Sequence, residues 1–365
     1  MTPMAANESN EAAQRLRHWL LNGPAQIADG PEQGAIAGTI NSAGQADYAY
    51  GEITGYYLHW LASAHLRRVV DEAWLIAKAK AAVSWCERRF DQAHSVPTRI
   101  ALGDSSSTIT DDWRNKAEFS FDLAMLVGGL VAARRRSLIE TPKSLLSALL
   151  SRLENCAREE GLAPLLCGVN ASDLPQRWST QSGHFLTKAA ARILSAEFIV
   201  EVPVALAAAC HAHIERFGST APIASYPLHP TLYYLEGELA VACERNGASA
   251  SALKRLVNAG ADDGSLPESA ATADIRRADI VAQALRVGVL LRACGERKAP
   301  TEKQLDRLAA NLSSRVNADG SIAFQPHATP PQRNVWCAMF AEQALAWHAQ
   351  WRTQRTLNAN AWDIV

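Results

Sequence analysis

Long and short connections alternate between the helical segments of this chain, and this alternation limits the folds that it can adopt. Apolar residues recur with helical spacing in about twelve segments. After one segment the chain turns within a few residues, and after the next it runs through a long connection that contains Gly and Pro. If consecutive helices pack antiparallel, all long connections lie at one end of the molecule, where binding sites are commonly built. The alternation therefore predicts helical hairpins with one elaborated end.

Start and stop signals bound these segments. Thr141 is expected to cap a helix whose first turn contains Pro142, and Thr301 with Gln304 forms a capping box. The stretch PTRIAL at 97–102 has the composition of a short strand. The expected helical segments are 11–21, 52–68, 71–90, 117–135, 141–159, 182–198, 203–218, 229–247, 251–260, 273–295, 301–316 and 333–351.

The helical segments fall into two alternating kinds. Those after long connections, such as LAMLVGGLVAA and VWCAMFAEQALAW, are apolar all round, whereas most of their partners carry one apolar stripe. The first pattern indicates a buried helix and the second a helix with one face in water, although the helix after Pro203 is unusually apolar for the second kind. We therefore predict an all-α protein, a single (α/α)6 toroid spanning residues 1–365, with six inner and six outer helices. A two-domain helical array is the alternative; an open solenoid is disfavoured because no strict repeat occurs.

Composition limits which kinds of partner the protein can bind and in which cellular compartment we expect it. The net charge of −1 argues against nucleic acid or an anionic membrane surface as the main partner. No signal peptide is visible, and the longest apolar run, AMLVGGLVAA, is shorter than the ~20 residues that span a bilayer. The seven cysteines are scattered singly, which is typical of buried thiols in a reducing cytoplasm. We expect a cytoplasmic protein that binds a small molecule.

Candidate site residues lie in the first turns of the inner helices, because the long connections precede these helices. Unpaired backbone N–H groups and partial positive charge at such ends suit an anion or a polarised oxygen. The expected catalytic residues are Glu52, Asp122, Glu236, His184, His229 and Tyr56. The expected substrate-binding residues are Tyr57, Tyr233, Asp279, Arg276, Arg277, Arg333 and Trp336.

These residue types suit a saccharide. Paired carboxylates can protonate a leaving oxygen and activate water, arginines hold anionic groups through two parallel hydrogen bonds, and aromatic rings stack on the apolar faces of sugars. Each residue also has a structural alternative, such as a helix-start acid favoured by the helix dipole alone. No metal-binding spacing, Gly-rich phosphate loop or nucleophile elbow occurs, so we expect no metal and no cofactor.

The helix starts YGEITGYYL, FSFDLAMLVGGL, HPTLYYLEG and DGSIAF…NVWCAMFAEQALAW resemble those of the α/α-toroid (six-hairpin) superfamily. This superfamily includes unsaturated-glucuronyl hydrolases, uronate lyases and N-acylglucosamine-type epimerases. The resemblance implies a role for Asp122 as the helix-start acid, with His229 and Arg333 as weaker analogues. The DGSL and DGSI turns also resemble those of terpene-cyclase toroids, although the DxDD acid cluster of class II cyclases is absent.

The expected function is that of a glycoside hydrolase that uses carboxylate acid/base catalysis on a small saccharide, with uronates among the candidates. Hydrolysis is favoured because carboxylates are plentiful at the predicted site. The alternatives are a sugar epimerase or uronate lyase, a toroid enzyme acting on a terpenoid or other natural product, and a non-catalytic scaffold that binds a glycan or peptide.

Overall fold

The computed structural model describes residues 2–90, 96–103, 111–166, 173–218, 227–241, 246–326 and 332–365. Two compact units divide the chain. One comprises Met1–Gly23 with Thr220–Val365, and the other comprises Pro24–Ser219. We call them the terminal unit and the middle unit. The expectation of a single domain over residues 1–365 stays a prediction.

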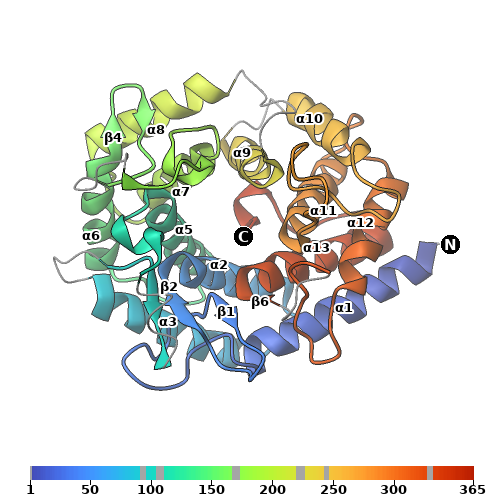
Figure 1. Cartoon of the computed structure of the whole chain (residues 1–365), viewed down its shortest axis with the longest axis horizontal. Coiled ribbons are helices and arrows are strands. Elements are labelled where there is room, and N and C mark those ends of the chain that lie inside the picture. Colours follow the sequence, from blue (N-terminus) through green and yellow to red (C-terminus); the bar gives the residue numbers. More distant parts are fainter. Residues whose placement is uncertain are drawn as a thin grey trace. The chain divides into compact units, whose positions relative to one another are not determined.

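The middle unit is built from helical hairpins (Figure 1). Its helices are α2 (Gly51–Arg67), α3 (Glu72–Phe90), α5 (Ser120–Arg135), α6 (Lys143–Leu153), α7 (Leu186–Leu194) and α8 (Val204–Phe217). Its strands are β1 (Thr39–Ile40), β2 (Tyr48–Tyr50), β3 (Arg99–Ala101), β4 (Ala157–Arg158) and β5 (Gly161–Leu162). The strand expected in PTRIAL is confirmed as β3, which pairs antiparallel with β2.

The terminal unit is also built mainly from helices. Its helices are α1 (Thr2–Asn22), α9 (Leu228–Val241), α10 (Asn246–Asn258), α11 (Ala278–Ala293), α12 (Glu302–Ser314) and α13 (Val335–Gln354), and β6 (Arg333–Asn334) immediately precedes α13. The long helix α1 packs against α13, so the first and last helices of the chain form a pair. α1 begins well before the expected start at residue 11.

Burial confirms the two kinds of helix. Every residue of α2 from Ile53 to Ala64 is buried, and α5, α9, α11 and α13 are buried almost all round. α6 and α12 bury one stripe each. α8, which seemed too apolar for an outer helix, also buries a single stripe, and its Val204 is 79% exposed. All-round burial therefore identifies the inner helices.

Helix starts are set by local hydrogen bonds, and one expectation about them is wrong. Thr301 and Gln304 form the predicted capping box at the start of α12. Thr141 does not cap α6, because its hydroxyl donates instead to the carbonyl of Leu130 in α5 (3.0 Å). The tertiary contact with the preceding helix replaces the local cap.

The DGSL and DGSI turns are built alike and lie against outer helices of the terminal unit. In each, the Asp carboxylate accepts hydrogen bonds from the backbone N–H and the hydroxyl of the Ser two residues later. The intervening Gly264 and Gly320 have φ of +82° and +86°, where a side chain would be strained. A Cβ on Gly264 would lie 2.2 Å from the Arg307 carbonyl oxygen of α12. These glycines let long connections pack closely on the outer helices.

His213 of α8 has a structural role. Its Nδ1 accepts from the Leu162 N–H (3.3 Å), and its Nε2 lies 3.2 Å from the Gly183 carbonyl oxygen, to which a protonated Nε2 donates. Burial lowers the pKa of His213 from 6.5 to about 4, so the ring is neutral at neutral pH. A second proton on Nδ1 would face the Leu162 N–H and break this contact. His213 thus holds β5 and the segment before α7 against α8.

His213 is expected to make the protein acid-sensitive. Since its pKa is lower in the folded protein than in the unfolded chain, its contribution to stability is present above pH 6.5 and is lost as the pH falls toward about 4. The difference in free energy of unfolding between the wild type and His213→Gln, measured with urea, should therefore shrink by about 3 kcal/mol between pH 7 and pH 4. A difference that does not change with pH would contradict this account.

A helix with the length and apolarity needed to cross a bilayer does not occur in the part of the chain that the structure describes.

Candidate functional site

The predicted site residues fall into two groups, one in each unit. Glu52, Tyr56, Tyr57, Asp122 and His184 belong to the middle unit. Glu236, His229, Tyr233, Arg276, Arg277, Asp279, Arg333 and Trp336 belong to the terminal unit.

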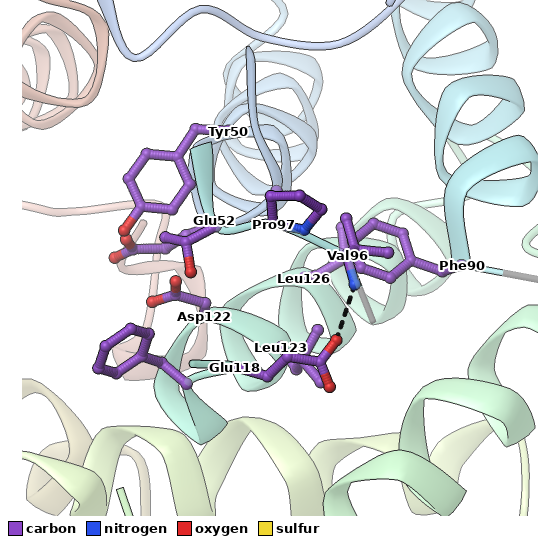
Figure 2. A pocket seen from close by; sticks show the side chains of 12 residues that line it. Tyr50, Glu52, Phe90, Val96, Pro97, Glu118, Asp122, Leu123 and Leu126 are labelled. Atoms are coloured by element: carbon purple, nitrogen blue, oxygen red, sulfur yellow. Dashed lines mark hydrogen bonds between the residues drawn. The ribbon is translucent and has the colours of Figure 1, made fainter. Parts of the chain in front are cut away.

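Glu52 and Asp122 come together at the starts of two inner helices of the middle unit. Glu52 lies in the first turn of α2 and Asp122 in the first turn of α5. In Figure 2 their carboxylates point toward one another, with the hydroxyl of Tyr50 beside them. The sequence predicted both acids as candidates, and the structure makes them neighbours.

Two glycines bring these helices close enough for the acids to meet. Gly55 of α2 packs directly on α5, where an added Cβ would lie 2.5 Å from the Met125 carbonyl oxygen. Gly129 of α5 packs in return on α2, and its added Cβ would lie 2.1 Å from the Gly55 carbonyl oxygen. Since Cβ atoms cannot approach backbone oxygens this closely, only glycine allows this crossing of the two backbones. The crossing lies one turn beyond Glu52.

A pocket opens beside the acid pair. It encloses about 330 Å³ of empty space, part of which is open to solvent. One side is acidic, with Glu52, Asp122 and Glu118, and Glu118 accepts hydrogen bonds from the Val96 N–H and from Arg152. The remaining wall is largely apolar and is formed by Phe90, Val96, Pro97, Phe119, Leu123 and Leu126. An apolar wall facing a few polar groups is typical of small-molecule sites.

Burial makes both carboxyls of the pair weaker acids. Desolvation raises the pKa of Asp122 well above its usual 3.8, and the nearby charge of Glu52 raises it further. The pKa of Glu52 is also raised by desolvation, but hydrogen bonds from Tyr50 and Tyr56 and the charge of Lys188 oppose the rise. Oδ2 of Asp122 is buried and has no hydrogen-bond partner among the described residues. Of the two acids, Asp122 is therefore the one that keeps its proton at higher pH.

Tyr56 and Lys188 lie next to Glu52 in the interior. The ammonium group of Lys188, on α7, lies 4.9 Å from the centre of the Tyr56 ring, and Lys188 is only 1% exposed. The phenol of Tyr56 is among the groups that oppose the rise in the pKa of Glu52. A cation over an aromatic ring stabilises negative charge on that ring, so this pair is suited to proton transfer.

The other two candidates of the middle unit have different surroundings. Tyr57 is completely buried, and its ring packs against Trp60 at a centroid distance of 5.5 Å, which favours a core role. His184 is 4% exposed, and burial lowers its pKa from 6.5 to about 4. His184 is therefore a neutral imidazole at neutral pH.

A second polar cluster lies at the starts of inner helices in the terminal unit. Arg277 donates two hydrogen bonds to Asp279, at 3.1 and 2.6 Å, and a third to Glu268. Asp279 Oδ2 also lies 3.4 Å from the indole nitrogen of Trp336 and 3.6 Å from Nδ1 of His229. The paired Arg277 helps to hold the pKa of Asp279 below 3.8 despite its burial. Asp279 is thus ionised and paired with Arg277, in contrast to Asp122.

His229 belongs to this cluster and is neutral at neutral pH. Its Nδ1 lies 2.7 Å from the side-chain oxygen of Gln283, and its ring packs on Tyr233 at 4.4 Å between centroids. Burial lowers its pKa from 6.5 to about 4, although Asp279 opposes the change. The structure thus groups four predicted residues, Arg277, Asp279, His229 and Trp336, with Tyr233 beside them.

The three remaining candidates are held by structural contacts. Glu236 is buried and accepts hydrogen bonds from Nε and Nη2 of Arg286, at 2.8 and 2.5 Å. Arg276 donates to the carbonyl and the hydroxyl of Ser265, and Arg333 lies 3.4 Å from Asp319. Ser265 and Asp319 belong to the DGSL and DGSI turns. These contacts favour roles in stability and loop anchoring over the predicted catalytic and binding ones.

Sequence reasoning did not assign Tyr50, Arg99 or Glu118 to the site. Tyr50 precedes the first turn of α2, and Arg99 lies opposite it in the β2–β3 pair. The strand-like character of PTRIAL was the only signal in the sequence that could have linked Arg99 to this place. Within the described residues, no group of three or more His, Cys, Asp or Glu side chains is arranged to hold a metal ion.

No protein-family model and no curated protein sequence matches the chain. Solved structures match it over nearly their whole length. A glycosidase in complex with glucose has a TM-score of 0.61 at 12% identity, with 94% of this chain and 97% of that chain covered. An unsaturated glucuronyl hydrolase specific for heparin has a TM-score of 0.60 at 12% identity, covering 96% and 98%. A type II terpene cyclase from Scytonema, in complex with merosterolic acid A, has a TM-score of 0.55 at 13% identity, covering 94% and 98%.

At these identities the likeness shows the fold. It agrees with the sequence expectation of paired inner and outer helices and with the resemblance in the helix starts. The chain has the all-α, α/α-toroid fold of these proteins.

Proposed function

We propose that the protein is a carbohydrate-active enzyme, a glycoside hydrolase whose active site is the pocket beside Glu52 and Asp122. The observation that carries the proposal is the acid pair: two buried carboxyls that point toward one another in the first turns of α2 and α5 (Figure 2). Glycoside hydrolysis needs one carboxyl that holds a proton and a second that is ionised. The fold shared with the glycosidase and the glucuronyl hydrolase supports the choice.

Asp122 takes the part of the general acid. Its pKa is raised well above 3.8, so it carries a proton at a pH where an exposed aspartate would have lost it. It would donate this proton to the glycosidic oxygen as the bond to the leaving group breaks. Burial also raises the pKa of Glu52, but Tyr50, Lys188 and Tyr56 oppose this rise, so Glu52 takes the part of the ionised partner. It would activate water or stabilise the positive charge that develops on the sugar ring.

The pocket suits a small saccharide. It is open to solvent on one side, and its apolar wall can face one side of a sugar ring. The charges of Lys188 and Arg99 act on the acid pair and favour an anionic substituent, such as a uronate carboxylate. The five described cysteines are free thiols, consistent with the proposed cytoplasmic location; Cys167 and Cys243 lie outside the described residues.

A second candidate is a uronate lyase or epimerase. The observation that favours it is the Tyr56–Lys188 pair, since a buried ammonium stabilises the phenolate form of a tyrosine, and a phenolate can take up the proton beside a uronate carboxylate. The cluster of Arg277, Asp279, His229 and Trp336 in the terminal unit stays a predicted substrate-binding site. Both candidates use the acid pair, but they form different products.

Turnover of defined saccharides tests the proposal. The protein should release the fluorophore from at least one 4-methylumbelliferyl hexoside or uronide, or hydrolyse an unsaturated uronyl disaccharide. Proton NMR of the first product formed would distinguish retention from inversion. A new absorbance from a carbon–carbon double bond, or interconversion without cleavage, would support the lyase or epimerase instead. Folded protein that neither converts nor binds any of these compounds would refute the proposal.

A further inference from the structure

Tyr50 is fixed at the junction between β2 and α2. Its backbone N–H donates to the Ile36 carbonyl (3.0 Å), and its carbonyl accepts from the Thr54 hydroxyl (2.9 Å). Its backbone is extended, with φ of −143°, and it pairs with Arg99 in the β2–β3 ladder. These backbone contacts therefore fix the position from which the Tyr50 side chain extends.

The ring of Tyr50 is also held in place by its neighbours. Its centroid lies 6.1 Å from that of Tyr48 and 5.9 Å from the guanidinium carbon of Arg99. In Figure 2 the ring extends from the strand toward Glu52, and its hydroxyl lies at the carboxylates. The hydroxyl lies beside both carboxylates and, as a hydrogen-bond partner, lowers the pKa of Glu52 and of Asp122. Tyr50 is therefore shared by the two acids.

A phenol has one proton to donate and lone pairs to accept with. The single proton cannot be donated to two carboxylates at once. When one acid is protonated and the other is ionised, the hydroxyl therefore accepts a hydrogen bond from the protonated acid and donates one to the ionised acid. We propose that Tyr50 is a positioning residue that links the acid pair, accepting a hydrogen bond from protonated Asp122 and donating its own to ionised Glu52. The hydroxyl thereby favours the arrangement in which the proton resides on Asp122.

This inference rests on the proposed function, because it assigns Tyr50 the task of keeping acid and base distinct. Two like carboxyls close together otherwise share their protons and titrate as a pair. A hydrogen bond donated to an ionised group stabilises it more than one between neutral groups. Tyr50 supplies such a bond to Glu52, whereas burial and the charge of Glu52 raise the pKa of Asp122 more than the charges of Arg99 and Arg114 lower it.

Carboxyl ¹³C NMR titration of Glu52 tests the inference without any need for turnover. The titration is measured in the wild type, Tyr50→Phe and Tyr48→Phe. Tyr48 is the matched control, because it lies on the same strand, packs on Arg99 and has its hydroxyl bonded to Thr39 rather than to an acid. In Tyr50→Phe the Glu52 midpoint should move up by about one pH unit, whereas Tyr48→Phe should leave it in place.

An unchanged Glu52 midpoint in Tyr50→Phe, or an equal shift in both variants, would overturn the inference. Saccharide turnover by the wild type is measured separately. If Tyr50→Phe shifts the midpoint and no saccharide is converted, the link between the acids stands and the proposed hydrolase activity fails. If a saccharide is converted and the midpoint does not move, the hydrolase stands and the role of Tyr50 fails.

Discussion

Asp122→Asn is expected to lower kcat on a converted saccharide by about 10²–10⁴-fold, the range that general acid catalysis contributes. An amide fills the same space but cannot deliver the proton. Glu52→Gln should cause a loss of similar size, because it removes the ionised partner. Glu342→Gln is the matched control, since Glu342 is an equally buried acid that is paired with Arg17 in the terminal unit. It should weaken the fold and leave the turnover of the folded protein unchanged.

The same Asp122→Asn substitution should make the protein more stable at neutral pH. The pKa of Asp122 is higher in the folded protein than in the unfolded chain. Its contribution to stability is therefore fully present below about pH 4 and is lost as the pH rises through the raised pKa. Asn has no such dependence, so the gain in Tm over the wild type should grow from pH 4 upward. A loss of activity without this pH-dependent gain would mean that Asp122 is not held protonated.

Arg286→Met is expected to lower the free energy of unfolding by about 3–5 kcal/mol, the cost of leaving a buried charge without its partner. Arg286 is 0% exposed, donates two hydrogen bonds to Glu236, and has its guanidinium carbon 4.0 Å from the centre of the Phe340 ring. Without it, Glu236 would have to take up a proton or remain charged in the interior. Urea unfolding measures the change.

Two further variants test whether the loss of stability comes from the buried ion pair or from any change of charge. Removing both partners, in Glu236→Leu with Arg286→Met, should restore much of the lost stability, because no unpaired charge is left. Arg307→Met breaks an ion pair with the fully exposed Asp262 and should leave the stability unchanged. If the single Arg286 variant proves as stable as the wild type, the structural role given to Glu236 is wrong.

The architecture could be predicted because it depends on signals that are repeated along the chain. All-round apolar helices such as α5 and α13 are buried from both sides, and striped helices such as α6 bury one face, so burial follows directly from local periodicity. The first turns of α1 could not be predicted, because their sequence is polar and has no apolar period. The Thr141 cap failed because a contact with Leu130, eleven residues away, overrode a local rule.

The site was predicted only in part, for a similar reason. Glu52 and Asp122 stand out as acids at helix starts, and their position alone made them candidates. Tyr50 could not be recognised, because its role depends on the pairing of β2 with β3 and on the helix crossing at Gly55. Glu236 was a candidate because it is an acid between apolar residues, whereas in the structure Arg286, 50 residues away, pairs with it. Long-range pairing of charges is not encoded in local spacing.

The protonation state of Asp122 at pH 7 tests the central claim most directly. Infrared difference spectra of the wild type minus Asp122→Asn report the carbonyl stretch of a protonated carboxyl, which is separate from the carboxylate bands. The account predicts a protonated-carboxyl band at pH 7 that disappears in the variant and is retained in Glu342→Gln. A wild type that shows only carboxylate bands for Asp122 at this pH would contradict the account.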